Sequence, residues 1–126
     1  MTPVLLFLFY FLISSNLIST YKIVIEKPSA NSVFQANDNC LIRWTSFDAE
    51  PYFSHVDIQL AFSTPDSHTI VSTIAHNFDV THTHFLRFIT PKRSFSEGNY
   101  FIIFKAVGVD YETYSPIFKI VSGSSP

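Results

Sequence analysis

The chain has 126 residues, enough for one domain, and only 14% of them are charged, against about 25% in an ordinary soluble domain. Its formal net charge of -2, with no basic run, argues against nucleic-acid binding. A single cysteine excludes a disulfide within the chain, and the apolar and aromatic content excludes a disordered tail.

The first twenty residues hold much of the apolar excess. Residues 4–13 form an unbroken apolar run, which small polar residues end at Ser14 and Ser15. A membrane-spanning helix needs about 20 apolar residues, whereas a shorter apolar core followed by small polar residues is typical of a secretory signal peptide. We therefore predict a signal peptide over residues 1–20, secretion, and no stable membrane span. An uncleaved anchor is the alternative.

The composition after residue 20 favours strands. This part of the chain holds eleven Ile and eight Val but only three Leu, and it is rich in aromatic residues. β-branched and aromatic side chains suit a pleated, half-buried surface, whereas Leu and Ala favour helices. We therefore expect an all-β domain, and a chain of this length can bury one sandwich core.

Seven short segments separated by turn residues read as strands, most of them alternating between apolar and polar residues and 68–75 of mixed facing. They are residues 21–26, 40–45, 55–62, 68–75, 82–90, 100–107 and 116–121. Val33 and Phe34 are expected to point inward from the turn-rich stretch between the first two, and residues 77–81 are read as a loop. The pattern predicts an immunoglobulin-like (fibronectin III-like) seven-stranded antiparallel β-sandwich without a disulfide, over residues 21–121. Residues 122–126 are expected to form a short Ser-rich tail without a lipid-anchor signal.

Residues that could carry chemistry are few. His82 and His84 stand two apart on a predicted strand, so both face the same way, and His76 or Asp79 could join them as metal ligands. The alternative is a solvent-facing polar pair, and we predict no metal and no other cofactor. Cys40 is expected to be a small buried hydrophobe and not a nucleophile. No motif pairs an acid with a base, so we predict a protein that is not an enzyme.

Apolar residues on the outward face of two predicted strands are more informative. If Tyr100, Ile102 and Phe104 point inward, Phe101 and Ile103 point outward. Ile117 flanks Lys119 in the same way on the last strand, which neighbours the previous one in an immunoglobulin-like order. We predict that Phe101, Ile103 and Ile117 form one exposed apolar patch that binds a ligand or partner. Cover by a loop or by residues 29–39 is the alternative.

An ordered set of motifs resembles a fungal extracellular domain. Each motif is short, but together they span residues 23–120 in the expected order. They are Ile23–Pro28 with Val33–Ala36, Ile42–Thr45, Val56–Leu60, Ile70–Ala75, Phe88–Pro91, Gly98–Ile102 and Tyr114–Ile120. The chain resembles the Ser-Thr-rich, often GPI-anchored fungal membrane proteins, which share this domain with the N-terminal part of yeast cell-wall synthesis proteins of β-1,6-glucan assembly. Asn37 stands where the family usually has Gly, Phe88 replaces the usual Trp, and the family's long Ser/Thr-rich stalk does not follow.

The resemblance implies an immunoglobulin-like sandwich, secretion and a cell-wall or surface location, and it carries no known catalytic residue. It leads us to expect a non-catalytic wall domain whose partner is cell-wall polysaccharide (β-glucan) or a wall protein. A structural interaction module, such as a homodimer through the same patch, is the alternative. An enzyme that acts on wall polysaccharide is the third hypothesis.

Overall fold

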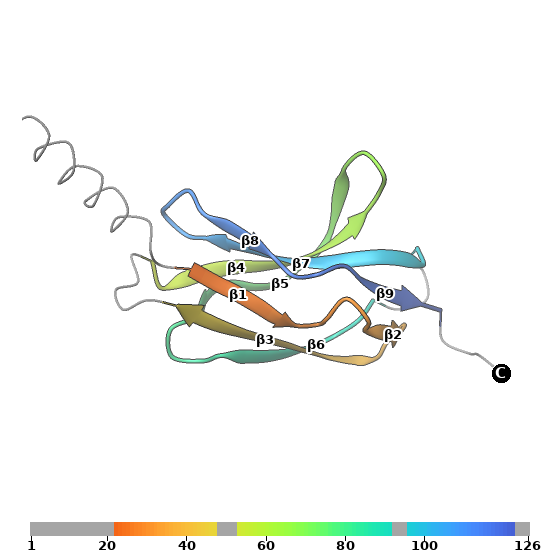
Figure 1. Cartoon of the computed structure of the whole chain (residues 1–126), viewed down its shortest axis with the longest axis horizontal. Coiled ribbons are helices and arrows are strands. Elements are labelled where there is room, and N and C mark those ends of the chain that lie inside the picture. The colour runs from red at the N-terminus through yellow and green to blue at the C-terminus, as the bar shows by residue number, and fades with distance from the viewer. Residues whose placement is uncertain (1–21, 48–52, 92–95, 123–126) are drawn as a thin grey trace, which may run out of the picture.

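The computed structural model describes residues 22–47, 53–91 and 96–122, which form nine strands in two packed sheets (Figure 1). The predicted signal peptide and most of the predicted tail lie outside these residues. The described residues contain no helix long and apolar enough to cross a membrane.

The smaller sheet has three antiparallel strands in the order β1-β3-β6. They are β1 (Lys22–Lys27), β3 (Asn39–Phe47) and β6 (Phe85–Ile89). Alternation determines which side chains face the core: Ile23 and Ile25 of β1 are buried, while the other residues of the strand are exposed. The register places Ile25 opposite Trp44, so the inward rows of β1 and β3 coincide.

The larger sheet has the order β2-β9-β7-β4-β5, with β8 also paired to β7. Its central strands are β4 (His55–Ser63) and β7 (Gly98–Ala106), which pair antiparallel along seven residues. The other strands are β2 (Val33–Gln35), β5 (His68–Asp79), β8 (Glu112–Tyr114) and β9 (Phe118–Val121). The short β2 runs parallel to β9 at one edge of the sheet.

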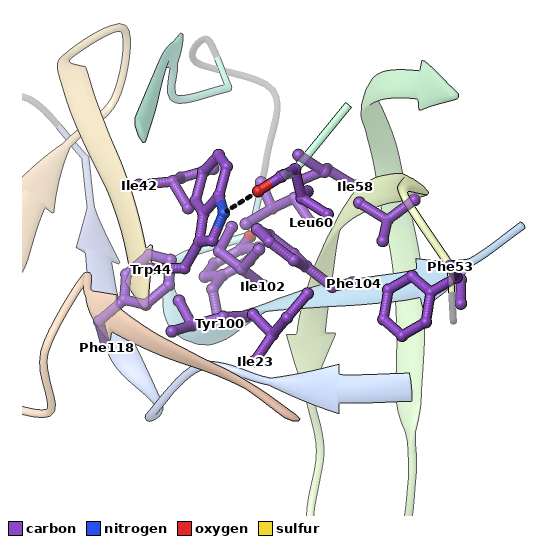
Figure 2. Close-up of a cluster of buried hydrophobic side chains, with 14 of the residues drawn as sticks. Ile23, Ile42, Trp44, Phe53, Ile58, Leu60, Tyr100, Ile102, Phe104 and Phe118 are labelled. Carbon is purple, nitrogen blue, oxygen red and sulfur yellow. Dashed lines mark hydrogen bonds between the residues drawn. The ribbon is translucent and has the colours of Figure 1, made fainter. Parts of the chain in front are cut away.

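Large apolar side chains of both sheets meet in one core around Trp44 (Figure 2). The Trp44 ring packs edge-on against Phe104, with ring centroids 5.0 Å apart. Its Nε1–H donates a hydrogen bond of 3.3 Å to the carbonyl of Val80, drawn as the dashed line in Figure 2. The one polar group of this large side chain is therefore satisfied inside the core.

The two sheets are also joined along one edge by side-chain hydrogen bonds to β1. The hydroxyl of Tyr111 accepts a bond of 3.0 Å from the Ile23 amide, and the hydroxyl of Thr113 donates one of 3.2 Å to the Ile23 carbonyl. Side chains from the β8 region thus cover the free edge of β1, where another chain would otherwise pair.

The predicted fold class is confirmed, and the structure refines its strands. Two three-residue strands, β2 and β8, add to the seven expected, and the β2–β9 pair is parallel. Residues 77–79, read as a loop, extend β5. Val33 is 61% exposed, so its expected inward placement was wrong, whereas Phe34 packs on Phe118 with ring centroids 5.7 Å apart.

Asn37, which replaces the family's usual Gly, has a φ of 62°. This left-handed conformation is easy for Gly and, among other residues, most accessible to Asn and Asp. The Asn37 amide donates a bond of 2.9 Å to the carbonyl of Pro91 and ties the turn to the end of β6. The substitution therefore keeps the backbone geometry that Gly would supply.

Candidate binding surfaces

Strands β7 and β8 lie side by side in the larger sheet (Figure 1), and aromatic side chains gather on its outer face where they pair. Phe101 and Tyr114 pack nearly perpendicular, with ring centroids 5.8 Å apart, and the His68 ring contacts Phe101 from the other side at 5.4 Å. Tyr114 is 52% exposed and Phe101 is partly buried. We call Phe101, Tyr114 and the nearby Ile117 the aromatic patch.

Tyr114 is held in place by an acidic neighbour on its own strand. Its hydroxyl donates a hydrogen bond of 2.8 Å to Oε1 of Glu112. This bond, followed by desolvation and the charge of Glu112, raises the pKa of the Tyr114 phenol above its usual value. The phenol therefore stays protonated at neutral and mildly alkaline pH.

The structure corrects the prediction for Ile103, which is only 3% exposed. It does face outward, because it lies outside the core cluster and directly opposite Gln59 on one side and Tyr114 on the other. Directly opposed residues on one sheet face have Cβ atoms about 5 Å apart, so these two neighbours cover it. The cover comes from the same sheet face, whereas residues 33–35 lie at the β9 edge.

Ile117 remains 49% exposed, in the short segment between β8 and β9. Ser115 creates this break: its amide donates to the Ile102 carbonyl at 2.9 Å, and its hydroxyl accepts from the Ile102 amide at 2.8 Å. A buried hydroxyl thus takes the place of a strand partner for the Ile102 amide where β8 ends. Tyr114 was not among the residues predicted for the patch, although it directly precedes Ser115 and Pro116, which cannot continue a strand ladder.

A second candidate surface is a groove on the outer side of the smaller sheet. It has a volume of about 360 Å³, at the lower end of the range of about 300–1,000 Å³ for small-molecule sites. The groove lies where pairing between β3 and β6 ends, since Phe85, the first residue of β6, is opposite Arg43. Its lining is Glu26, Arg43, Trp44, Thr45, Ser46, His84 and Phe85.

The chemistry of this groove is mixed. Phe85 is 56% exposed, and the Nε of Arg43 lies 3.4 Å from Oε1 of Glu26. An exposed ring beside charged and hydroxyl groups suits a ligand with both apolar and polar faces. The sequence signal was the outward alternation of Phe85, Arg87 and Ile89.

The predicted histidine pair does not form on a strand. β6 begins at Phe85, so His82 and His84 belong to the preceding turn, and the expectation of a strand over 82–90 was wrong there. His82 instead approaches Asp79, with Nδ1 2.7 Å from Oδ2. No group of three or more His, Cys, Asp or Glu in the described part of the chain could hold a metal ion.

Asp79 organises this turn. Its carboxylate accepts hydrogen bonds from the hydroxyl and amide of Thr81, at 2.7 and 2.9 Å, and contacts His82. These bonds, that from the Thr81 hydroxyl first, hold the pKa of the Asp79 carboxyl well below its usual value. The role of the group is structural: it caps the turn between β5 and β6.

Cys40 is fully buried in β3, as expected. Desolvation, with a further contribution from the charge of Asp38, raises the pKa of its thiol to about 12. Because the thiolate is the reactive form, this side chain is a poor nucleophile at neutral pH.

Comparison with known proteins agrees with this architecture. Residues 27–120 match the family model of the Kre9/KNH-like N-terminal Ig-like domain. No protein with a curated description matches the chain. Among solved structures, fibronectin(III)-like modules of Clostridium thermocellum CbhA are similar, with 17% identity and a TM-score of 0.42, over 80% of this chain and 94% of that chain. That similarity is too weak to bear on function.

The family match covers most of the chain and agrees with the ordered motifs, which resembled the cell-wall synthesis proteins. The chain therefore belongs to the family of Kre9/KNH-like N-terminal Ig-like domains, related to cell-wall glucan assembly.

Proposed function

We propose that the protein is a secreted, non-catalytic domain of the fungal cell wall that binds wall glycan through the aromatic patch. Membership of the Kre9/KNH-like family supports a wall-associated role. The observation that carries the glycan assignment is the exposure of Tyr114, whose ring packs on Phe101, and of Ile117 three residues later.

The geometry of the patch suits a sugar ring. Sugar rings present C–H faces that pack on aromatic and aliphatic surfaces, while their hydroxyls need polar partners at the rim. Tyr114 offers a half-exposed ring with the Glu112 carboxylate at its edge, and Phe101 supports that ring from beneath the surface. Rigid aromatic side chains lose little conformational entropy on binding, which favours them as anchors.

Retention of the protein on insoluble β-glucan tests the proposal. Tyr114→Ala is expected to lower retention about tenfold, as for an aromatic anchor at a binding surface. Tyr114→Phe is the matched control, because it keeps the ring and removes only the bond to Glu112, and it should retain most of the binding. A wild-type protein that no β-glucan or wall fraction retains would contradict glycan binding.

A structural interaction module remains the second candidate, because the same patch would also suit a second copy of the chain. Its mass in solution separates the two readings. A dimer that Tyr114→Ala converts to a monomer, together with no glucan retention, would favour the interaction module. A strict monomer at high concentration argues against it. Incubation with β-1,3- and β-1,6-glucans, followed by reducing-end analysis, tests the non-catalytic part, since released ends would contradict it.

A further inference from the structure

The strands of the smaller sheet carry most of the positive charge that the structure places. They hold four basic residues, Lys22, Lys27, Arg43 and Arg87, and one carboxylate, Glu26. The strands of the larger sheet hold two lysines, Lys105 and Lys119, and three carboxylates, Asp57, Asp79 and Glu112. A chain with a formal net charge of -2 therefore has one basic sheet.

These basic side chains lie on the outer face. Lys22 and Arg43 alternate along their strands with buried residues such as Ile23 and Trp44, and Arg87 alternates with residues packed against the core. All four are exposed. Among the residues that the structure describes, only Arg43 has an ion-pair partner, Glu26. We call Lys22, Lys27, Arg43 and Arg87 the basic face.

The register brings two of these charges together. Lys27 pairs with Arg43 across a register shift that leaves Glu26 as the extra residue of β1, so two like charges that repel each other are close at this point of the sheet. Glu26 offsets part of this repulsion, but the three strands still hold four basic residues against one carboxylate. A bound anion would neutralise the remaining positive charge and gain favourable contacts with these side chains.

The charges are spaced along the direction of β3, with two on β1, one on β3 itself and one on β6. Lys22 is opposite Phe47, Lys27 is opposite Arg43, and Arg87 is opposite Leu41. With a rise of about 3.3 Å per residue, the steps between these rows are about 13 and 7 Å. Charges spaced in this way fit an extended polymer with repeated negative groups better than a single small anion.

The groove and Phe85 indicate what kind of polymer. Phe85 lies opposite Arg43 and presents a ring that is 56% exposed, and Thr45 and Ser46 line the same groove. A sugar ring can pack its C–H face on Phe85 while its hydroxyls bond to the groove and a neighbouring anionic group reaches Arg43 or Lys27. An extended acidic peptide would use the charges but would have less use for the exposed ring and the hydroxyls.

We infer that the basic face binds an anionic polysaccharide, a chain bearing carboxylate or phosphate groups, which lies along β3 over Phe85. This site is on the opposite sheet from the aromatic patch and takes a different ligand. It is therefore independent of the proposed binding of neutral glucan.

A matched pair of polymers tests this inference: an unmodified soluble β-glucan and the same glucan after carboxymethylation. The full protein is expected to bind the carboxymethylated polymer at least tenfold more tightly at low salt, with the preference shrinking as salt screens the exposed charges. Arg87→Gln and Lys27→Gln should each weaken that binding about two- to fivefold, the range for a single exposed charge. Lys105→Gln and Lys119→Gln, on the larger sheet, are the controls and should leave it unchanged.

Several outcomes would overturn the inference. Equal binding of the two polymers, or equal losses from the basic-face and control variants, would remove the site. Tighter binding to polyglutamate or to anionic lipid vesicles would reassign the face to an acidic protein segment or a membrane and contradict the polysaccharide. Tyr114→Ala separates the two sites: it should reduce retention on neutral glucan and leave binding of the carboxymethylated polymer intact.

Discussion

The outer faces of the two sheets differ in their chemistry: the larger sheet carries apolar side chains and the smaller sheet carries basic ones. On the larger sheet, Ile103 is buried between Gln59 and Tyr114, while Tyr114 itself stays half-exposed. On the smaller sheet, three of four basic residues have no carboxylate partner among the described residues. An apolar side chain can be covered by neighbours on its own face, whereas an exposed group of like charges attracts ligands of the opposite charge.

Both faces depend on one core, and removing its centre should destroy both. Trp44→Ala is expected to lower the free energy of unfolding by about 3–5 kcal/mol, because it empties a large buried volume between the sheets. Denaturant unfolding measures the loss. Trp44→Phe should cost less, since it keeps part of the packing and loses the bond to Val80. A loss below 1 kcal/mol for the Ala variant would show that the sheets do not share this core.

The difference between covered and exposed residues on the larger sheet can be tested directly. Ile103→Ala is expected to cost about 2–5 kcal/mol, the range for a buried aliphatic side chain. Ile117→Ala, at a half-exposed position, should change stability by less than about 0.5 kcal/mol. Chemical denaturation of the two variants under the same conditions provides the comparison. Equal effects would mean that the cover over Ile103 is absent in solution.

Ser115 links stability to the shape of the aromatic patch. Ser115→Ala leaves the Ile102 amide without its buried partner, which is expected to cost about 1–3 kcal/mol. Because Ser115 fixes the backbone between Tyr114 and Ile117, retention on β-glucan should also fall. Binding of the carboxymethylated polymer should persist under conditions where the variant is folded. Loss of both binding activities in a folded variant would show that the two faces are coupled.

The smallest expected effect concerns pH and the turn beside the basic sheet. The pKa of Asp79 is lower in the folded protein than its ordinary value of 3.8, so the ionised group favours the folded state at neutral pH. That contribution disappears as pH falls from about 4 through the folded-state pKa. Melting temperatures between pH 7 and pH 2.5 should therefore fall less steeply for Asp79→Asn than for the wild type. Parallel curves for the two proteins would contradict this role.

Sequence periodicity predicted the core because successive side chains of a strand point to opposite faces of the sheet. Cys40, Ile42 and Trp44 alternate in β3, and Tyr100, Ile102 and Phe104 in β7, and all six are buried as expected. The prediction failed where position was set by a neighbour far away in the chain. The cover of Ile103 depends on Gln59 and Tyr114, and the short parallel β2 depends on β9.

For the candidate sites, too, alternation predicted which way side chains face but not which neighbours they meet. Alternation correctly placed Phe101 and Ile103 on the outward face, but it contained no information on which neighbour shields which side chain. The basic face also arises from pairing, since Lys22, Arg43 and Arg87 are far apart in sequence and come to share one face only through the register of β1, β3 and β6.

The buried thiol of Cys40 has a practical consequence. With a pKa of about 12 and no exposed surface, it should not react with thiol reagents while β3 stays paired on both sides. Because it is the chain's single cysteine, the rate at which its thiol is labelled measures how often the smaller sheet opens. Labelling without denaturant requires β1 or β6 to separate from β3. An anionic polymer that binds all three strands should therefore slow the labelling.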